Sequence, residues 1–315
     1  MSKPEILQIG AYPEWDQPLL EERFVMHRYF EAADKKAFLA ELGPRIKGIA
    51  TNGEKGASRE IIESCPNLRI ISVFGVGYDA VDLAACREHH VRVTNTPDVL
   101  TEDVADLAVA MMLALGRGVV GADRWVRSGD WAAKGPYPLQ RRVHGARAGI
   151  LGLGRIGMAV AKRLRGFDME VAYSNPQPKE YAADLHYLPD PVALAEWSDV
   201  LFVTLAATRE TRHIVGPAVI AALGREGMLI NASRAANVDE EALLKALEAR
   251  ELGGAALDVF EGEPNVEPRF KGLDNVLLQP HQGSATFRTR KEMGGLVREN
   301  LTAFFEGHPL LTPVI

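Results

Sequence analysis

Residues 149–157 read Gly-Ile-Leu-Gly-Leu-Gly-Arg-Ile-Gly, and this stretch decides the fold. It continues an apolar run typical of a strand, and a helix is predicted directly after it, over residues 158–165. The glycines have separate uses: Gly152 permits a tight turn, Gly154 lets the backbone approach a pyrophosphate, and Gly157 lets helix and strand pack closely. A strand, a glycine turn and a helix N-terminus in this order predict a dinucleotide-binding loop. A plain glycine turn is the weaker alternative.

The next predicted strand ends where the adenosine ribose of a dinucleotide would lie. An NAD site places a carboxylate at this point, whereas this chain has Ser174 and Asn175, followed by Lys179. A 2′-phosphate would meet no negative charge here, and it would find hydrogen-bond donors and one positive charge. We therefore favour NADP(H) as the cofactor and keep NAD(H) as the alternative, because no arginine stands in this segment.

Short apolar runs alternate with helical segments on both sides of the glycine loop, which predicts parallel sheets covered by helices. In the second half, strands are predicted at residues 148–151, 170–174, 200–205, 228–231, 255–259 and 276–279. In the first third, they are predicted at 5–10, 24–30, 46–51, 68–74 and 91–95. A helix is predicted from Thr101, and another over 285–305. The second sheet is complete without the last helix, so we expect that helix to return to the first domain.

The prediction is thus an α/β fold of two doubly wound parallel-sheet domains, with the second inserted into the first. Residues 1–98 and 286–315 would form the substrate domain, and residues 99–285 the cofactor domain. The two crossings would lie near Pro97, which restrains the chain before and after it, and near Gly283.

Composition limits the classes of function. The chain has 315 residues, of which 47% are hydrophobic and 25% charged, as in ordinary globular proteins. Its net charge of −6 offers nucleic acid no general attraction. No apolar stretch reaches the ~18 residues of a membrane span, so no membrane contact is expected. Cys65 and Cys86 form no CxxC pair and the N-terminus lacks a signal-peptide pattern, so we expect a cytoplasmic protein without disulfides.

Three ionisable residues follow later strands, where ligands bind in parallel sheets: Arg234, Glu263 and His281. A protonated His281 would donate a proton to a keto oxygen as hydride arrives, and Glu263 would favour the charged imidazole and raise its pKa. Arg234 would hold a substrate carboxylate bidentately and polarise the keto oxygen. Each residue alone is explained as well by a structural or surface role. Together with the glycine loop they predict a keto-acid reductase site, with no metal ligands.

A second turn, Gly75-Val76-Gly77, follows a strand of the first domain and precedes a helix. Its N–H groups would bind a carboxylate; the alternative is an ordinary turn. Asn52 and Leu100 are hypothesised to touch the substrate side chain.

These segments together resemble the D-isomer-specific 2-hydroxyacid dehydrogenases along almost the whole chain. The resemblance is strongest to glyoxylate/hydroxypyruvate reductases, with hydroxyphenylpyruvate and ketogluconate reductases nearby. The matching stretches are the glycine loop and residues 73–79, 95–100, 103–106, 231–234, 257–260, 263–264 and 280–286.

The resemblance implies two Rossmann-like domains and reduction of a small 2-keto acid to a D-2-hydroxy acid by NAD(P)H. It implies that Arg234, Glu263 and His281 are catalytic, and that Arg234 and His281 bind the substrate together with the backbone of Val76 and Gly77. It also implies a homodimer built through the cofactor domains, with an arm that contains Trp125, Trp131 and Tyr137. The further cofactor contacts predicted on this basis are Thr101, Arg155, Ile156, Ala232 and Asp258.

Three positions depart from the family pattern. Ala235 stands where a glycine usually follows the catalytic arginine, and Ala206 and Ala207 replace a loop that usually contains proline. The arginine that the NADP-using branch carries near Asn175 is missing. We expect these changes to affect cofactor preference and substrate choice more than the reaction.

Other functions remain open. Formate dehydrogenases share the architecture, but the extra polar residues that a one-carbon anion needs are not evident. Phosphoglycerate dehydrogenases often carry a further C-terminal domain, for which we expect no room after Ile315. A dinucleotide-sensing, corepressor-like binding protein would bind cofactor with little turnover, and the complete set of Arg234, Glu263 and His281 argues against it.

Overall fold

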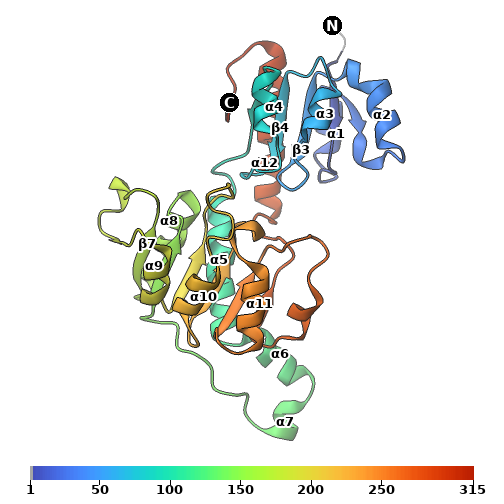
Figure 1. The fold of residues 1–315 in the computed structure, drawn as a ribbon. Coiled ribbons are helices and arrows are strands. Elements are labelled where there is room, and N and C mark those ends of the chain that lie inside the picture. The colour runs from blue at the N-terminus through green and yellow to red at the C-terminus, as the bar shows by residue number, and fades with distance from the viewer. Residues whose placement is uncertain (1–2) are drawn as a thin grey trace. The chain divides into compact units, whose positions relative to one another are not determined.

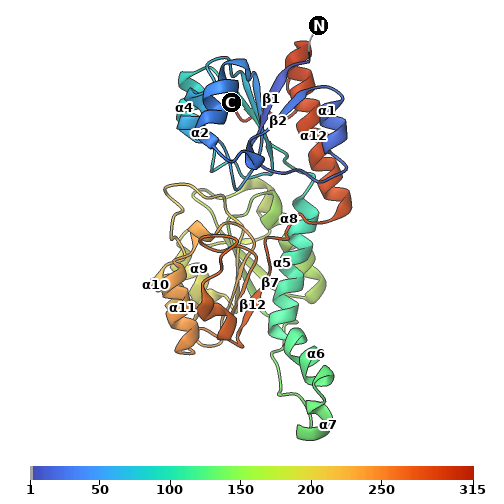
Figure 2. The ribbon, with the colours of Figure 1, turned by 90° about the vertical axis from the view of Figure 1, so that its right-hand side faces the viewer.

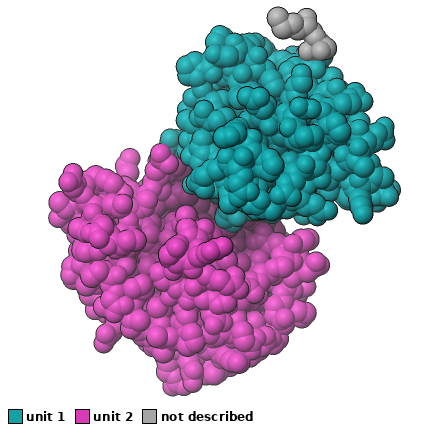
Figure 3. All heavy atoms as spheres, turned by 45° about the horizontal axis from the view of Figure 1, so that its top comes forward, with its two compact units in different colours: residues 1–100, 284–315 teal, residues 101–283 magenta. Residues whose placement is uncertain are grey.

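The computed structural model describes residues 3–315, which divide into two compact units (Figures 1 and 3). Unit 1 comprises the chain up to Leu100 together with Ser284–Ile315, and unit 2 comprises Thr101–Gly283. Unit 2 is therefore inserted into unit 1, as predicted. The sequence placed the two limits at residues 98/99 and 285/286.

Unit 1 contains a parallel sheet whose strands, within the described residues, follow the order β2-β1-β3-β4-β5. The strands are β1 (Glu5–Gln8), β2 (Val25–Arg28), β3 (Gly48–Asn52), β4 (Ile70–Phe74) and β5 (Arg92–Thr94). The α-helices are α1 (Gln17–Glu21), α2 (Lys35–Leu42), α3 (Arg59–Glu63), α4 (Leu83–Glu88) and α12 (Phe287–Glu306). Short 3₁₀ turns lie at Tyr29–Glu31 and Gly43–Arg45.

The C-terminal helix α12 packs against β4, so the end of the chain completes unit 1 (Figures 1 and 2). Met293, Val297 and Leu301 recur every fourth residue and are buried, which gives the helix its apolar face. The Thr286 hydroxyl caps the helix start by accepting the Thr289 N–H. The helix ends at Gly307, which adopts a left-handed φ of 76°.

Unit 2 contains a second parallel sheet, of order β12-β11-β10-β9-β6-β7-β8 within the described residues. The strands are β6 (Arg147–Leu151), β7 (Glu170–Ser174), β8 (His186–Tyr187), β9 (Val200–Val203), β10 (Met228–Asn231), β11 (Gly254–Leu257) and β12 (Val276–Leu278). The α-helices are α5 (Thr101–Gly116), α6 (Val119–Arg127), α7 (Asp130–Lys134), α8 (Arg155–Leu164), α9 (Pro191–Trp197), α10 (Pro217–Leu223) and α11 (Glu240–Glu248). Short 3₁₀ turns lie at Arg165–Phe167, Glu180–Ala182, Ala235–Asn237 and Pro268–Gly272.

The strand order of unit 2 reverses at β6, which pairs with β7 on one side and with β9 on the other. The connections that leave β6 and β9 therefore run to opposite faces of the sheet and open a crevice between them at the carboxyl ends of the strands. The glycine loop begins at this point. Two layers of apolar side chains, one on each face of the sheet, form the core of the unit.

Several elements differ from the prediction. The helix after the glycine loop begins at Arg155 rather than at residue 158, because Gly154 already acts as its N-cap. Strand β3 begins at Gly48 rather than at residue 46, because Ile46 ends a preceding 3₁₀ turn. Strand β8 was not predicted, since two residues are too short to show a period.

Among residues 3–315, no single helix is long and apolar enough to cross a membrane. Helices α5 and α6 reach the required length and composition only together, and they meet at an angle of 58°.

Candidate active site

The glycine loop follows β6 and opens α8. Gly152 has a φ of +98°, a backbone conformation that residues with a side chain rarely adopt. A Cβ there would lie 2.5 Å from Leu205 Cβ. A Cβ on Gly157 would lie 2.7 Å from the Gly152 carbonyl oxygen. A Cβ on Gly154, in contrast, would meet no atom of residues 3–315 within 4 Å. Gly152 and Gly157 thus serve the packing of the loop, while Gly154 leaves open space beside it.

That open space lies at the start of α8, where the first N–H groups have no partner within the helix and carry partial positive charge. Exposed backbone at Gly154 and a helix N-terminus together fit a pyrophosphate, so the loop fits a dinucleotide. Of the two predicted contacts in this first turn, Arg155 is exposed and Ile156 is half-buried.

The residues predicted to read the adenosine ribose already have partners within unit 2. Ser174 is buried, and its hydroxyl donates to the Pro189 carbonyl at 3.0 Å. The Asn175 carboxamide oxygen accepts the Leu153 N–H at 2.6 Å. Their contact with the cofactor stays a prediction.

His281 and Glu263 are paired. His281 Nδ1 lies 2.8 Å from Glu263 Oε2, and Oε1 of the same carboxylate accepts the Phe260 N–H at 2.8 Å. Burial alone would raise the pKa of Glu263, but these hydrogen bonds and the positive charge of Arg234 lower it below its ordinary value. The carboxylate therefore stays ionised beside the imidazole. Nε2 is the ring nitrogen that Glu263 does not engage.

Arg234 lies in a tight turn after β10. Asn231 Oδ1 accepts both the N–H and the hydroxyl of Ser233, at 3.0 and 2.8 Å, and Asn231 Nδ2 donates to the Arg234 carbonyl at 3.2 Å. The guanidinium donates to the Ser233 carbonyl at 2.9 Å, and its charge acts on Glu263. The structure thus brings Arg234 and the His281–Glu263 pair together at the carboxyl ends of neighbouring strands.

Asp258, which follows β11, holds the segment that carries His281. It is 2% exposed, and its two carboxylate oxygens accept the N–H groups of Gln282 at 2.6 Å and Gly283 at 2.8 Å. Burial raises the pKa of Asp258 above its ordinary value, against the effect of these hydrogen bonds. The sequence predicted a cofactor contact here and missed this positioning function, because partners 24 and 25 residues away leave no local pattern.

The turn Gly75-Val76-Gly77 lies in unit 1 and follows β4. Thr96 Oγ1 accepts the Gly75 N–H at 3.0 Å, and Asn95 Nδ2 donates to the Val76 carbonyl at 2.9 Å. Among the described residues, no protein acceptor is bonded to the N–H groups of Val76 and Gly77. Two fixed N–H groups of this kind are what a carboxylate requires.

The remaining predicted contacts are less distinctive. Asn52 ends β3 and accepts the Lys55 N–H at 2.8 Å, and Leu100 is buried at the end of the first segment of unit 1. In unit 2, Thr101 is the first residue of α5 and Ala232 follows β10, and both are half-buried. Their roles toward substrate or cofactor stay predictions.

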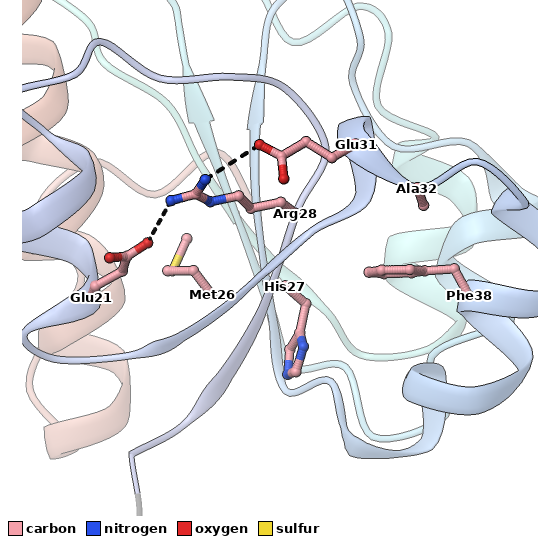
Figure 4. Close-up of a pocket in the computed structure, with 7 residues that line it drawn as sticks. All are labelled: Glu21, Met26, His27, Arg28, Glu31, Ala32 and Phe38. Atoms are coloured by element: carbon pink, nitrogen blue, oxygen red, sulfur yellow. Dashed lines mark hydrogen bonds and ion pairs between the residues drawn. The ribbon is translucent and has the colours of Figure 1, made fainter.

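Unit 1 also has an open pocket of about 530 Å³ beside β2, lined by Glu21, Met26, His27, Arg28, Glu31, Ala32 and Phe38 (Figure 4). Arg28 bridges the carboxylates of Glu21 at 3.0 Å and Glu31 at 3.3 Å, so its charge is neutralised within the pocket. The pocket contains none of the predicted site residues.

Comparison with known proteins points to one family. Residues 109–283 match the model of the D-isomer specific 2-hydroxyacid dehydrogenase NAD-binding domain. A glyoxylate/hydroxypyruvate reductase A of Arabidopsis thaliana is 48% identical over 94% of this chain and 94% of its own.

Two solved structures extend the likeness to the whole chain. A 2-hydroxyacid dehydrogenase of Ketogulonicigenium vulgare is 66% identical, with a TM-score of 0.93 over 100% of this chain and 99% of its own. An NADPH-dependent glyoxylate/hydroxypyruvate reductase of Sinorhizobium meliloti, in complex with NADP and malonate, is 40% identical, with a TM-score of 0.94 over 99% of this chain and 97% of its own.

Proposed function

Because this chain belongs to the D-isomer-specific 2-hydroxyacid dehydrogenase family, we propose that it reduces a small 2-keto acid, of the glyoxylate or hydroxypyruvate kind, to the D-2-hydroxy acid with NAD(P)H. One observation carries the proposal above the others. The His281–Glu263 pair and Arg234 lie together in the unit that contains the dinucleotide loop. This arrangement supplies both a proton donor and an anion-binding group.

Each residue has a distinct part in the proposed reaction. A reduced nicotinamide, when bound, supplies the hydride that reaches the keto carbon. His281 donates a proton from Nε2 to the keto oxygen as negative charge develops there, and Glu263 holds the imidazole through Nδ1. Arg234 binds the substrate carboxylate and polarises the keto group. The N–H groups of Val76 and Gly77 are the second proposed contact for the carboxylate.

NADP(H) is the cofactor that we propose to be preferred. Residues 175–179, directly after β7, contain no carboxylate that would repel a 2′-phosphate, and Lys179 adds a positive charge there. The Sinorhizobium meliloti relative was solved with NADP, which supports the same choice. Pro176 follows Asn175 in this chain and offers no charge, so we expect a modest preference over NAD(H).

A homodimer built through helices α6 and α7 of unit 2 is also proposed. These helices extend away from the sheet of unit 2 (Figures 1 and 2) and, with the segment after them, expose large apolar side chains. Those that are most exposed are Val119, Val126, Trp131 and Leu139. Apolar groups gathered on one arm are typical of a surface that a second copy covers.

A cytoplasmic location fits the cysteines. Cys65 and Cys86 are buried and form no disulfide, and burial raises the pKa of each thiol to about 11. Thiols of this kind are unreactive and need no oxidising compartment.

The test of the proposed function is steady-state oxidation of NADPH and NADH with glyoxylate, hydroxypyruvate, phenylpyruvate and 2-ketogluconate. We expect turnover with at least one of them, and a loss of most turnover in His281→Ala with cofactor affinity retained. Tight dinucleotide binding without turnover on any keto acid would instead favour the dinucleotide-sensing function. Normal activity of His281→Ala would refute the mechanism.

A further inference from the structure

Both backbone polar groups of one residue in the glycine loop are held by side chains from elsewhere in unit 2. Leu153 lies between Gly152 and Gly154, and its side chain is fully buried. Its N–H donates to Asn175 Oδ1 at 2.6 Å, and its carbonyl accepts the Tyr181 hydroxyl at 2.8 Å. These partners are 22 and 28 residues away, in the connection between β7 and β8.

This connection is itself fixed by two further tyrosines. The Tyr173 hydroxyl accepts the Lys179 N–H at 2.8 Å, and the Tyr187 hydroxyl donates to the Asn175 carbonyl at 3.0 Å. The two rings pack with their centroids 5.3 Å apart. Residues 175–181 therefore form a braced segment rather than a free loop, although their outer surface is exposed.

Tyr181 differs from the other two in its exposure. Its side chain is 61% exposed, so its burial contributes little to the stability of the fold. Its hydroxyl nevertheless reaches inward and donates to the Leu153 carbonyl. Tyr181 has no role in the proposed reaction, and neither the composition nor the spacing of the sequence predicted a function for it. Among residues 3–315, its hydrogen bond is to the loop that fits the pyrophosphate.

We infer that Tyr181 and Asn175 are positioning residues for the dinucleotide: they clamp the backbone N–H and carbonyl of Leu153 and so hold the glycine loop in its binding conformation before the cofactor arrives. This inference rests on the proposed function in so far as a dinucleotide is the ligand. It changes the predicted role of Asn175, whose carboxamide oxygen is used by the loop and not by the adenosine ribose.

The physical reason is conformational freedom. Gly152 and Gly154 flank Leu153, and glycine restricts the backbone less than any other residue. A loop of this kind would lose considerable entropy on binding unless something held it beforehand, and a clamp that orders it in advance strengthens binding. The pyrophosphate is common to NADPH and NADH, so the clamp acts on both cofactors alike, whereas a reader of the 2′-phosphate acts on NADPH alone.

Tyr181→Phe removes only the hydroxyl and is the first variant to test, with Tyr29→Phe in unit 1 as the matched control. The readout is the dissociation constant of each cofactor, measured by titration of the complete protein without substrate. We expect Tyr181→Phe to weaken NADPH and NADH binding by the same factor, about fivefold, as one hydrogen bond implies. We expect the unfolding temperature of the cofactor-free protein to fall by no more than the few degrees that the loss of one hydrogen bond implies. Tyr29→Phe should bind both cofactors like the parent.

Asn175→Leu keeps the branched shape of the side chain and leaves the Leu153 N–H without its acceptor, so it should weaken the binding of both cofactors further, by about tenfold. Parent-like affinity in Tyr181→Phe would overturn the inference, as would a loss confined to NADPH, which would make Tyr181 a reader of the 2′-phosphate. The binding assay separates this inference from the proposed function. A parent that binds dinucleotide without reducing any keto acid refutes the reductase and leaves the clamp standing, whereas a parent that binds neither cofactor refutes both.

Discussion

Exchanging single glycines of the loop for alanine should separate folding from cofactor binding. In Gly152→Ala the new methyl group would lie 2.5 Å from Leu205 Cβ and 2.6 Å from Leu205 Cα, at a φ of +98°. The left-handed backbone costs about 1–2 kcal/mol for an L side chain. Pressing the methyl group into packed backbone costs about 1–3 kcal/mol more. The sum of about 2–5 kcal/mol would lower the unfolding temperature of unit 2 by about 5–15 °C.

Gly154→Ala is the matched change in the same loop. The residue has a φ of −98°, and no atom of residues 3–315 lies within 4 Å of its new methyl group. Only the weaker N-cap preference of alanine remains, so the loss of stability should stay near or below about 1 kcal/mol. The methyl group would instead occupy the space assigned to the pyrophosphate, which should weaken cofactor binding by about 10- to 100-fold.

Two measurements on the purified variants are needed: thermal unfolding of the cofactor-free protein, and titration with NADPH. The expected pattern is an unstable Gly152→Ala and a stable Gly154→Ala that binds cofactor poorly. A stable Gly152→Ala would show that the loop relaxes away from Leu205. Parent-like affinity in Gly154→Ala would refute the assignment of the pyrophosphate to this space.

Three further predictions concern the catalytic residues and the arm. The pKa of Glu263 is lowered in the folded protein, so its ionised form stabilises the fold above the unfolded value of 4.5, and this contribution is lost as the pH falls through the folded value. Glu263→Gln should therefore have a lower free energy of unfolding than the parent at pH 7, measured by denaturant titration. This difference should shrink toward pH 3, and a difference that does not change with pH would contradict the pairing. Arg234→Lys cannot bind a carboxylate bidentately and should raise the KM of the keto acid by about 10- to 100-fold while leaving the KM of NADPH alone; an unchanged keto-acid KM in steady-state assays would remove Arg234 from the carboxylate site. Trp131→Ser should shift the protein toward monomer in sedimentation at fixed concentration, whereas the exposed Leu311→Ser of unit 1 should not, and equal behaviour of the two would refute the proposed interface.

Local patterns account for most of the fold and for the choice of the candidate site residues. Buried parallel strands are continuous apolar runs, so the strands of both sheets were visible in the sequence apart from the two-residue β8. The glycine loop was interpretable because each glycine there has its own steric reason. Arg234, Glu263 and His281 were found because each follows a strand that ends at the same edge of the sheet.

The supporting contacts were not predictable, since they join residues that are distant in the sequence. Asp258 bonds the backbone at Gln282 and Gly283, and Tyr181 bonds the carbonyl of Leu153. An isolated Asp or Tyr has many alternative explanations, and only the folded chain shows which backbone group it meets. The same limit applies to Ser174, which the sequence offered to the ribose and which the structure turns inward to the Pro189 carbonyl.

The most direct test of the central claim is the chirality of the product formed from hydroxypyruvate and NADPH by the unmodified protein. Membership of the D-isomer-specific family, with the keto acid held in one orientation by Arg234 and protonated by His281, predicts D-glycerate alone, formed in equal amount to the NADPH oxidised. Formation of L-glycerate or a racemic mixture would contradict the assigned arrangement of the site, and bound NADPH without any product would contradict the reductase itself.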